Sequence, residues 1–155
     1  MRALTDRGQL LLEMDTARGR AMEAIAGLTE AQMSQPGLDG WSVKDVLNHL
    51  TACDEFRFFE IEKVSRSGRL AYPGLSSDES DSLNHLIVTK RRSLSLSEVL
   101  RDLDAVRALV LEAISRAPDS ALDPAAYVDY PVNGSISHDR EHAAAIRAWR
   151  KREGI

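Results

Sequence analysis

Three histidines in this 155-residue chain have the type and spacing to bind a metal ion together. His138 and His142 are four residues apart, so in a helix they lie on one face with about 5–6 Å between their Cβ atoms. Ile146 and Trp149 continue that face at steps of four and three, which indicates that both imidazoles point inward. The alternative is a solvated helix on which two histidines fall four residues apart by chance.

His49 lies on a second apolar stripe, three residues after Val46 and four before Cys53. A single histidine on such a face is more often a core side chain hydrogen-bonded to a carbonyl than a ligand. In a helical bundle, however, inward side chains of facing helices converge, and metal sites are built from them. One imidazole from the earlier helix and two from the last helix would leave coordination positions open, as in catalytic metal sites.

The chemistry available to such a site is broad, because an ion held by three neutral imidazoles keeps its full charge for whatever fills the open positions. Bound water would become acidic, with a pKa of about 7. A bound thiol would lose its proton more readily still, and a thiolate is a strong nucleophile. Hydrolysis and thiol transfer are therefore both chemically feasible at such a site, and the identity of the ligands does not distinguish between them.

Four further residues lie near the three histidines or could reach them. Cys53 is interpreted as a small buried hydrophobe, with a fourth ligand or a redox-sensitive lid as the alternatives. Glu141 either orients the neighbouring histidines or favours the start of its helix. His85 is expected at the surface or at a bundle end rather than at the metal. Asp54 is expected to pair with an Arg or Lys of a neighbouring helix.

The elements that must position these residues are helices, because apolar residues recur at helical spacing in four long stretches. The predicted helices run from Thr5 to Ala26, from Ser42 to about Val64, from Asp81 to Ala117 with a pause at 91–93, and from Ser135 or Ser137 to Arg152. Capping boxes are predicted at Ser42 with Asp45 and at Ser95 with Glu98. The polar stretch up to Ser80 is expected to be a loop that crosses the bundle end.

These elements predict an all-α fold in one domain over residues 1–155, a four-helix bundle with a long crossover loop between the second and third helices. The inner face of the second helix is expected to carry Val43, Val46, Leu47, Leu50, Cys53, Phe56 and either Phe59 or Glu60. That of the last helix is expected to carry His138, His142, Ala145, Ile146 and Trp149.

Composition narrows the class of partner. The chain has 20 Lys and Arg against 24 Asp and Glu, a net charge of −4, which argues against nucleic acid and anionic membranes and for a small-molecule substrate. A single Cys excludes an internal disulfide and a four-thiolate metal site. We expect a cytoplasmic protein, because the first residues lack the apolar core of a secretory signal and no apolar run is long enough to span a bilayer.

Two motifs resemble those of a known family, the DinB-like superfamily. Its second helix opens with a Trp-Ser/Thr-x-Lys…His-Leu signature, which here is matched by Trp41-Ser42-Val43-Lys44 and then Asn48-His49-Leu50. Its closing His-x-x-Glu-His…Ile…Trp segment is matched by His138-Asp139-Arg140-Glu141-His142 with Ile146 and Trp149. The chain departs from the pattern at Cys53, where a Trp is common, and in the short polar stretch 132–135 before the last helix.

The resemblance implies a four-helix bundle with a long crossover, a divalent metal that is often zinc or nickel, and often a homodimer. It makes His49, His138 and His142 the ligands. Better-understood relatives are S-transferases and isomerases that use mycothiol or bacillithiol. The leading hypothesis is therefore a metal-dependent enzyme that transfers a low-molecular-weight thiol to an electrophilic small molecule. The alternatives are a non-catalytic metal-binding or stress-response module, a metal-dependent hydrolase, and a bundle whose histidines are merely packed.

Overall fold

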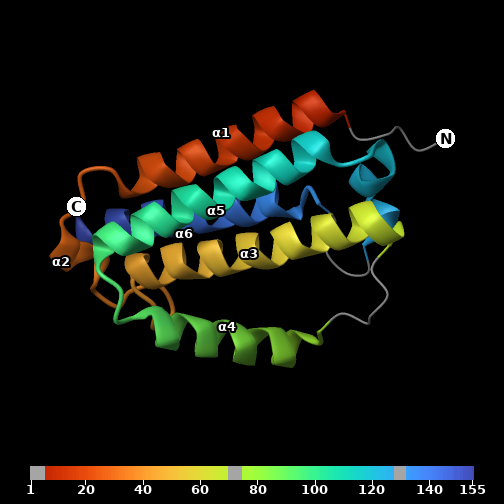
Figure 1. The fold of residues 1–155 in the computed structure, drawn as a ribbon. Coiled ribbons are helices and arrows are strands. Elements are labelled where there is room, and N and C mark those ends of the chain that lie inside the picture. Colours follow the sequence, from red (N-terminus) through yellow and green to blue (C-terminus); the bar gives the residue numbers. More distant parts are fainter. Residues whose placement is uncertain (1–5, 70–74, 128–131) are drawn as a thin grey trace.

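The computed structural model describes residues 6–69, 75–127 and 132–155, and these form six α-helices and two short 3₁₀ helices (Figure 1). The helices are α1 (Arg7–Ile25), α2 (Glu30–Met33), α3 (Val43–Ser67), α4 (Ser77–Arg91), α5 (Leu96–Arg116), η1 (Asp119–Leu122), η2 (Pro124–Ala126) and α6 (Gly134–Glu153). In the described ranges the only β pairing is a single bridge between Leu38 and Trp41. The prediction of an all-α protein is confirmed.

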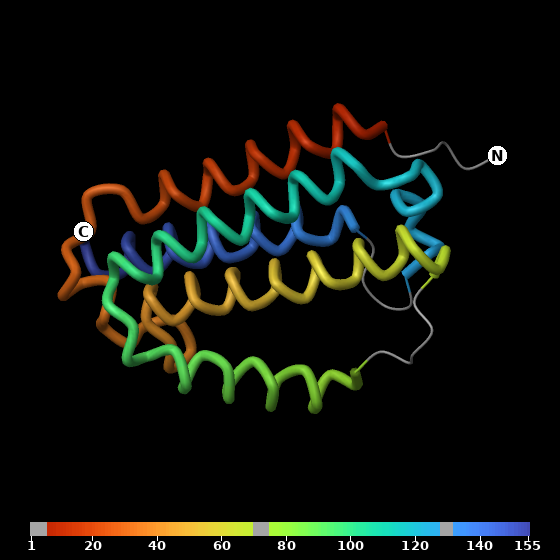
Figure 2. Tube along the Cα trace, in the orientation of Figure 1, coloured from red at the N-terminus to blue at the C-terminus, as the bar shows by residue number. Residues whose placement is uncertain are grey.

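Four long helices, α1, α3, α5 and α6, run side by side (Figures 1 and 2). They form two closely packed pairs, α3 with α5 and α1 with α6. The connection between α3 and α5 contains a further helix, α4, which packs chiefly on α3. The predicted third helix, Asp81 to Ala117, is therefore two separate helices, α4 and α5, and residues 70–74 of the predicted crossover loop lie outside the described part of the chain.

Local sequence fixes where the helices begin. The predicted capping boxes are present at Ser42 with Asp45 and at Ser95 with Glu98. A third, Ser76 with Glu79, starts α4 at Ser77, four residues before the predicted start at Asp81. In each box the hydroxyl accepts from a backbone N–H that has no partner in the helix, and the carboxylate accepts from the N–H of the cap.

The core is divided into two apolar clusters. One contains residues from the first half of α1 and the second halves of α3 and α5, including Leu10, Met14, Ile61, Val110 and Ile114. The other contains the opposite ends of these helices and the second half of α6, including Leu47, Leu50, Leu103, Ile146 and Trp149. The layer between the clusters is polar, and it contains the residues from which the candidate site is built.

Parts of the predicted inner faces are wrong. Phe56 and Phe59 have 47% and 68% of their surface exposed, whereas Glu60, the alternative to Phe59, is half-buried. Ala145 of α6 is exposed as well. On α3 the buried stripe passes from Leu50 through Asp54, Arg57, Ile61 and Val64, and on α6 it includes Asp139 and Ala143. The apolar pattern misleads because charged side chains occupy core positions where they can pair with one another.

In the described part of the chain, every helix is too short or too polar to cross a lipid bilayer.

The second core cluster packs against the loop after α2 through one close contact between Gly37 and Trp149. A Cβ atom on Gly37 would lie 2.3 Å from Nε1 of Trp149, so only glycine allows this approach. The loop and the end of α6 are thereby held together.

Candidate metal centre

Three imidazoles meet between α3 and α6. The Nε2 atom of His138 lies 2.9 Å from Nε2 of His49 and 3.0 Å from Nε2 of His142. The ring centroids are 4.8 Å apart for His49 and His138, 5.1 Å for His49 and His142, and 4.6 Å for the pair on α6. The structure therefore brings together all three histidines that the sequence singled out.

The start of α3 positions His49. The Ser42 capping box sets the first turn of the helix, and the Arg92 guanidinium donates to both carboxylate oxygens of Asp45. One turn further on, the Asn48 amide donates to the Arg91 carbonyl at 3.4 Å. These contacts hold the first turns of α3 to the turn between α4 and α5, so the backbone that carries His49 is anchored.

Burial keeps the imidazoles neutral. It lowers the pKa of His49 to about 4, with a further contribution from His142. Burial also lowers the pKa of His138 to about 3, with the neighbouring imidazoles and then the two nearby guanidinium groups adding to the effect. Burial also lowers the pKa of His142, and the negative charges of Asp139 and Glu141 partly oppose this lowering. Neutral imidazole is the form that binds metal ions.

A cation fits this arrangement better than hydrogen bonds do. Each neutral imidazole has one N–H and one lone pair, on opposite nitrogens. The Nε2 atom of His138 can therefore make one good hydrogen bond, but it lies against two other Nε2 atoms. Adjacent nitrogens about 3 Å apart can each lie about 2.1 Å from one ion, with angles of about 90° at the metal. The residues present thus fit a divalent ion.

Cys53 borders the same point. Its Sγ atom lies 3.8 Å from each ring nitrogen of His49, and the ligand atoms of His49, Cys53 and His138 all lie within 4.8 Å of one another. Burial and the charge of Asp54 raise the pKa of the half-buried thiol to about 12. A bound cation acts in the opposite direction and favours the thiolate. Cys53 is therefore close enough to serve as an additional ligand.

Next to the histidines lies a buried ionic network, which we call the charged layer. It consists of Arg18 from α1, Asp54 from α3, Arg107 from α5 and Asp139 from α6. Arg107 donates through Nε and Nη2 to Asp54 at 3.0 and 3.2 Å, and through Nη2 to Asp139 at 2.8 Å. Nη2 of Arg18 donates to Asp54 at 2.9 Å and to Asp139 at 3.2 Å. The predicted ion pair of Asp54 is confirmed.

The roles of Arg18, Arg107 and Asp139 were not predicted from the sequence. A signal exists, because Arg107 follows Leu103 by four residues and precedes Val110 by three, so it is in phase with the most regular apolar stripe of the chain. Arg18 stands in the same relation to Met14 and Ala21. A charged residue in phase with a core stripe predicts a buried partner of opposite charge.

Comparison with known families gives a clear result. A model of the DinB superfamily matches residues 13–149. The chain belongs to the DinB superfamily. A solved structure with a similar fold is an uncharacterised protein from Escherichia coli UTI89, with a TM-score of 0.78 and 18% sequence identity, covering 96% of this chain and 95% of that chain. A search of curated proteins found no match.

Two other residues that the sequence singled out in this DinB superfamily member, His85 and Glu141, lie at the surface. His85 of α4 is exposed, as expected for a residue outside the site. Glu141 is exposed too, and its charge partly opposes the lowering of the His142 pKa that burial causes. The alternative that Glu141 favours the start of its helix is wrong, because α6 begins at Gly134 and has no acidic residue in its first turn. The alternative that Glu141 orients the neighbouring histidines stays a prediction.

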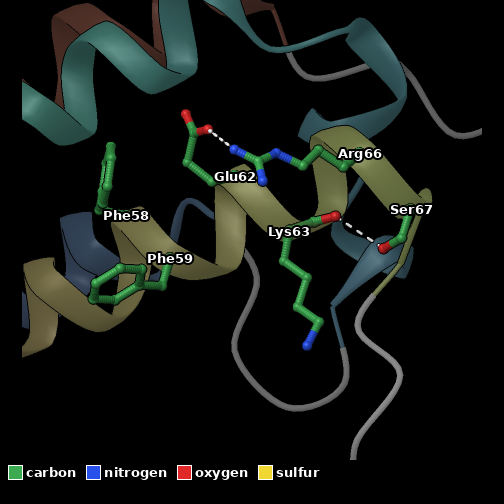
Figure 3. Close-up of a pocket in the computed structure, with 6 residues that line it drawn as sticks. All are labelled: Phe58, Phe59, Glu62, Lys63, Arg66 and Ser67. Atoms are coloured by element: carbon green, nitrogen blue, oxygen red, sulfur yellow. Dashed lines mark hydrogen bonds and ion pairs between the residues drawn. The ribbon is translucent and has the colours of Figure 1, made fainter.

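A hollow of about 670 Å³ lies further along α3 (Figure 3). Its lining residues are Phe58, Phe59, Glu62, Lys63, Arg66 and Ser67. All of them come from α3, and none of the three histidines is among them. The hollow is therefore distinct from the candidate metal centre of this DinB superfamily protein.

Proposed function

We propose that this protein is a metal-dependent enzyme of the DinB superfamily in which His49, His138 and His142 bind one divalent ion. The observation that carries the proposal is the position of His138 Nε2, within 3.0 Å of the Nε2 atoms of both other histidines. The membership of the superfamily supports it, because the matched residues 13–149 include all three histidines.

The ion, when bound, supplies a Lewis acid that lowers the pKa of a water or thiol in an open coordination position. The chain's own contribution is to keep the ligands neutral and aligned. Burial holds the pKa of His49 and His138 near 4 and 3, so protons do not compete for the nitrogens at neutral pH. Trp41 packs on the His49 ring with 5.1 Å between the ring centroids and restricts its orientation.

The reaction we propose is transfer of a low-molecular-weight thiol to a small electrophilic molecule, with zinc or nickel as the ion. Imidazole nitrogen suits both metals, and a thiol is a good ligand for a borderline-soft ion. The net charge of −4 supports a small substrate rather than a polyanion. We further propose that the protein acts as a homodimer, as the resemblance implies, and that it is cytoplasmic, as its sequence leads us to expect.

A second candidate is a non-catalytic metal-binding module. The observation that favours it is the position of Cys53, whose Sγ atom completes a compact group with His49 and His138. Four protein ligands would close a tetrahedral site and leave no position for a substrate, which is the arrangement of structural zinc sites. A metal-dependent hydrolase uses the same open three-histidine site with water in place of the thiol.

A thiol titration of the cobalt-substituted protein separates these candidates. For the transferase we expect a sulfur-to-cobalt absorption band that appears only when a small thiol is added, in the wild type and in Cys53→Ala alike. A band present without added thiol and lost in Cys53→Ala would favour the closed module. A cobalt spectrum that responds to pH but not to thiols would favour the hydrolase.

A further inference from the structure

The charged layer lies where the two halves of the metal centre meet. His49 and Cys53 belong to α3, which pairs with α5, whereas His138 and His142 belong to α6, which pairs with α1. The site therefore exists only while the α3–α5 pair keeps one fixed position relative to the α1–α6 pair. Contacts between core side chains of the two helix pairs have to set this position.

Each arginine of the charged layer connects the two pairs. Arg107, from the α3–α5 pair, bonds to Asp54 of its own pair and to Asp139 of the other. Arg18, from the α1–α6 pair, bonds to Asp139 of its own pair and to Asp54 of the other. The four side chains have between 1% and 8% of their surface exposed, so water hardly screens these bonds.

Both carboxylates lie on the helices that carry the proposed ligands. Asp139 directly follows His138, and Asp54 lies five residues after His49, next to Cys53. The apolar clusters on either side of the layer hold the helices together, but burial of apolar surface is not directional and tolerates small shifts. Charge-assisted hydrogen bonds fix distance and angle, and the two-nitrogen contact of Arg107 with Asp54 fixes them most strictly.

We propose that Arg107 is a positioning residue for the metal centre: with Asp54, Asp139 and Arg18 it sets the spacing between α3 and α6 at which His49 meets the two histidines of α6. This inference rests on the proposed metal site. Arg107 touches none of the ligands' nitrogens in this role. It acts through the two carboxylates and the backbone that carries the neighbouring ligands.

The two arginines offer a matched pair of conservative variants. Arg107 binds the carboxylates through two nitrogens, a geometry that a lysine ammonium does not reproduce. Arg18 binds both carboxylates through Nη2 alone, and its Nε and Nη1 atoms are buried without a hydrogen-bond partner. Arg107→Lys and Arg18→Lys both keep the charge, but only the first removes a two-nitrogen contact.

The test measures the dissociation constant for Co²⁺ by competition with a chelator, together with the cobalt spectrum. We expect Arg107→Lys to weaken binding by about 10-fold to 100-fold, the usual effect of losing a partner that orients a metal site, and to alter the spectrum. Arg18→Lys should stay within about threefold of the wild type. The control Arg116→Gln removes the exposed ion pairs with Glu62 of α3 and Glu112 of α5, outside the charged layer, and should change neither readout.

A second readout does not need the metal. Spin labels at Phe59→Cys on α3 and Arg140→Cys on α6, in a Cys53→Ser background, report the distance between these helices in the metal-free protein. A broadened or shifted distance distribution in Arg107→Lys, with that of Arg18→Lys unchanged, supports positioning even if the wild type were to bind no ion. The inference would be overturned if Arg107→Lys bound the metal as tightly as the wild type, or if both lysine variants lost the same amount of metal affinity. An unchanged distance distribution in Arg107→Lys would overturn it as well.

Discussion

The metal-free protein should lose stability in mild acid because of the same histidines that bind the ion. In the folded chain burial lowers the pKa of His49 to about 4 and that of His138 to about 3, whereas an unfolded chain has a histidine pKa of about 6.5. At pH values between these, the histidines of the unfolded chain are protonated, whereas His49 and His138 of the folded chain stay neutral. The free energy of unfolding therefore falls as pH decreases from about 6.5, and the fall ends below the folded pKa values.

The size of the effect follows from the two pKa values. At about pH 5 an unfolded histidine is almost fully protonated and the buried ones are almost fully neutral, so each histidine costs about 2 kcal/mol relative to neutral pH. Carboxylates titrate in the same range, so the effect has to be read as a difference between variants. His138→Gln removes one buried titrating group, whereas His85→Gln removes an exposed histidine of α4 as a matched control.

The assay is urea unfolding of chelator-treated protein at about pH 7.5 and about pH 5. We expect the drop in unfolding free energy between the two conditions to be about 2 kcal/mol smaller in His138→Gln than in the wild type, and unchanged in His85→Gln. Equal drops in all three proteins would refute the reasoning, because His138 would then titrate no differently in the folded and unfolded chain.

Three further predictions concern stability, and urea unfolding measures each of them. Asp54→Asn removes the negative charge that two buried guanidinium groups share, and it should lower the free energy of unfolding by about 3–5 kcal/mol. Arg91→Gln breaks the half-exposed ion pair between α3 and α4 and should lower it by less than about 1 kcal/mol. Similar losses in the two variants would contradict the argument from burial. Gly37→Ala should cost about 1–3 kcal/mol, because its Cβ atom would lie 2.3 Å from Trp149 Nε1, and a neutral result would mean that the loop shifts freely. Ser42→Ala removes the cap of α3 and should cost about 1 kcal/mol, and an unchanged midpoint would show that the cap is dispensable.

The local features of the fold could be predicted from the sequence. The capping boxes at Ser42 and Ser95 place the starts of α3 and α5 correctly, because a cap depends on residues only three positions apart. The start of α4 was missed, although Ser76 and Glu79 have the same spacing, because the polar composition of that stretch resembles a loop. Cap chemistry is thus a better guide there than composition.

The inner face of α3 could be predicted only as far as Cys53, which lies beside His49. Beyond it, apolarity favours Phe56 and Phe59, but the buried face carries Asp54 and Arg57. Whether a charged residue is buried depends on its partners, and Arg18 and Arg107 are 36 and 53 residues away from Asp54 along the chain. Pairing at that separation is a property of the tertiary packing and leaves no local pattern.

The candidate site was predicted better than the charged layer around it. The phase of His138 and His142 against Ile146 and Trp149 indicates an inward pair, and the structure places His49 against that pair. The spacing placed Cys53 on the same face as His49, and its Sγ atom lies 3.8 Å from both ring nitrogens of that histidine. Its role could not be predicted, because a residue one turn away can face the metal or pack beside it.

The most direct test of the central claim is the metal content of protein purified without a histidine tag. We predict one divalent ion per chain, lost on combined substitution of His49, His138 and His142 by Ala and retained on His85→Ala. Circular dichroism on the same samples shows whether the triple variant is folded. A wild type that binds no divalent ion even after reconstitution, or a folded triple variant that keeps its ion, would contradict the account.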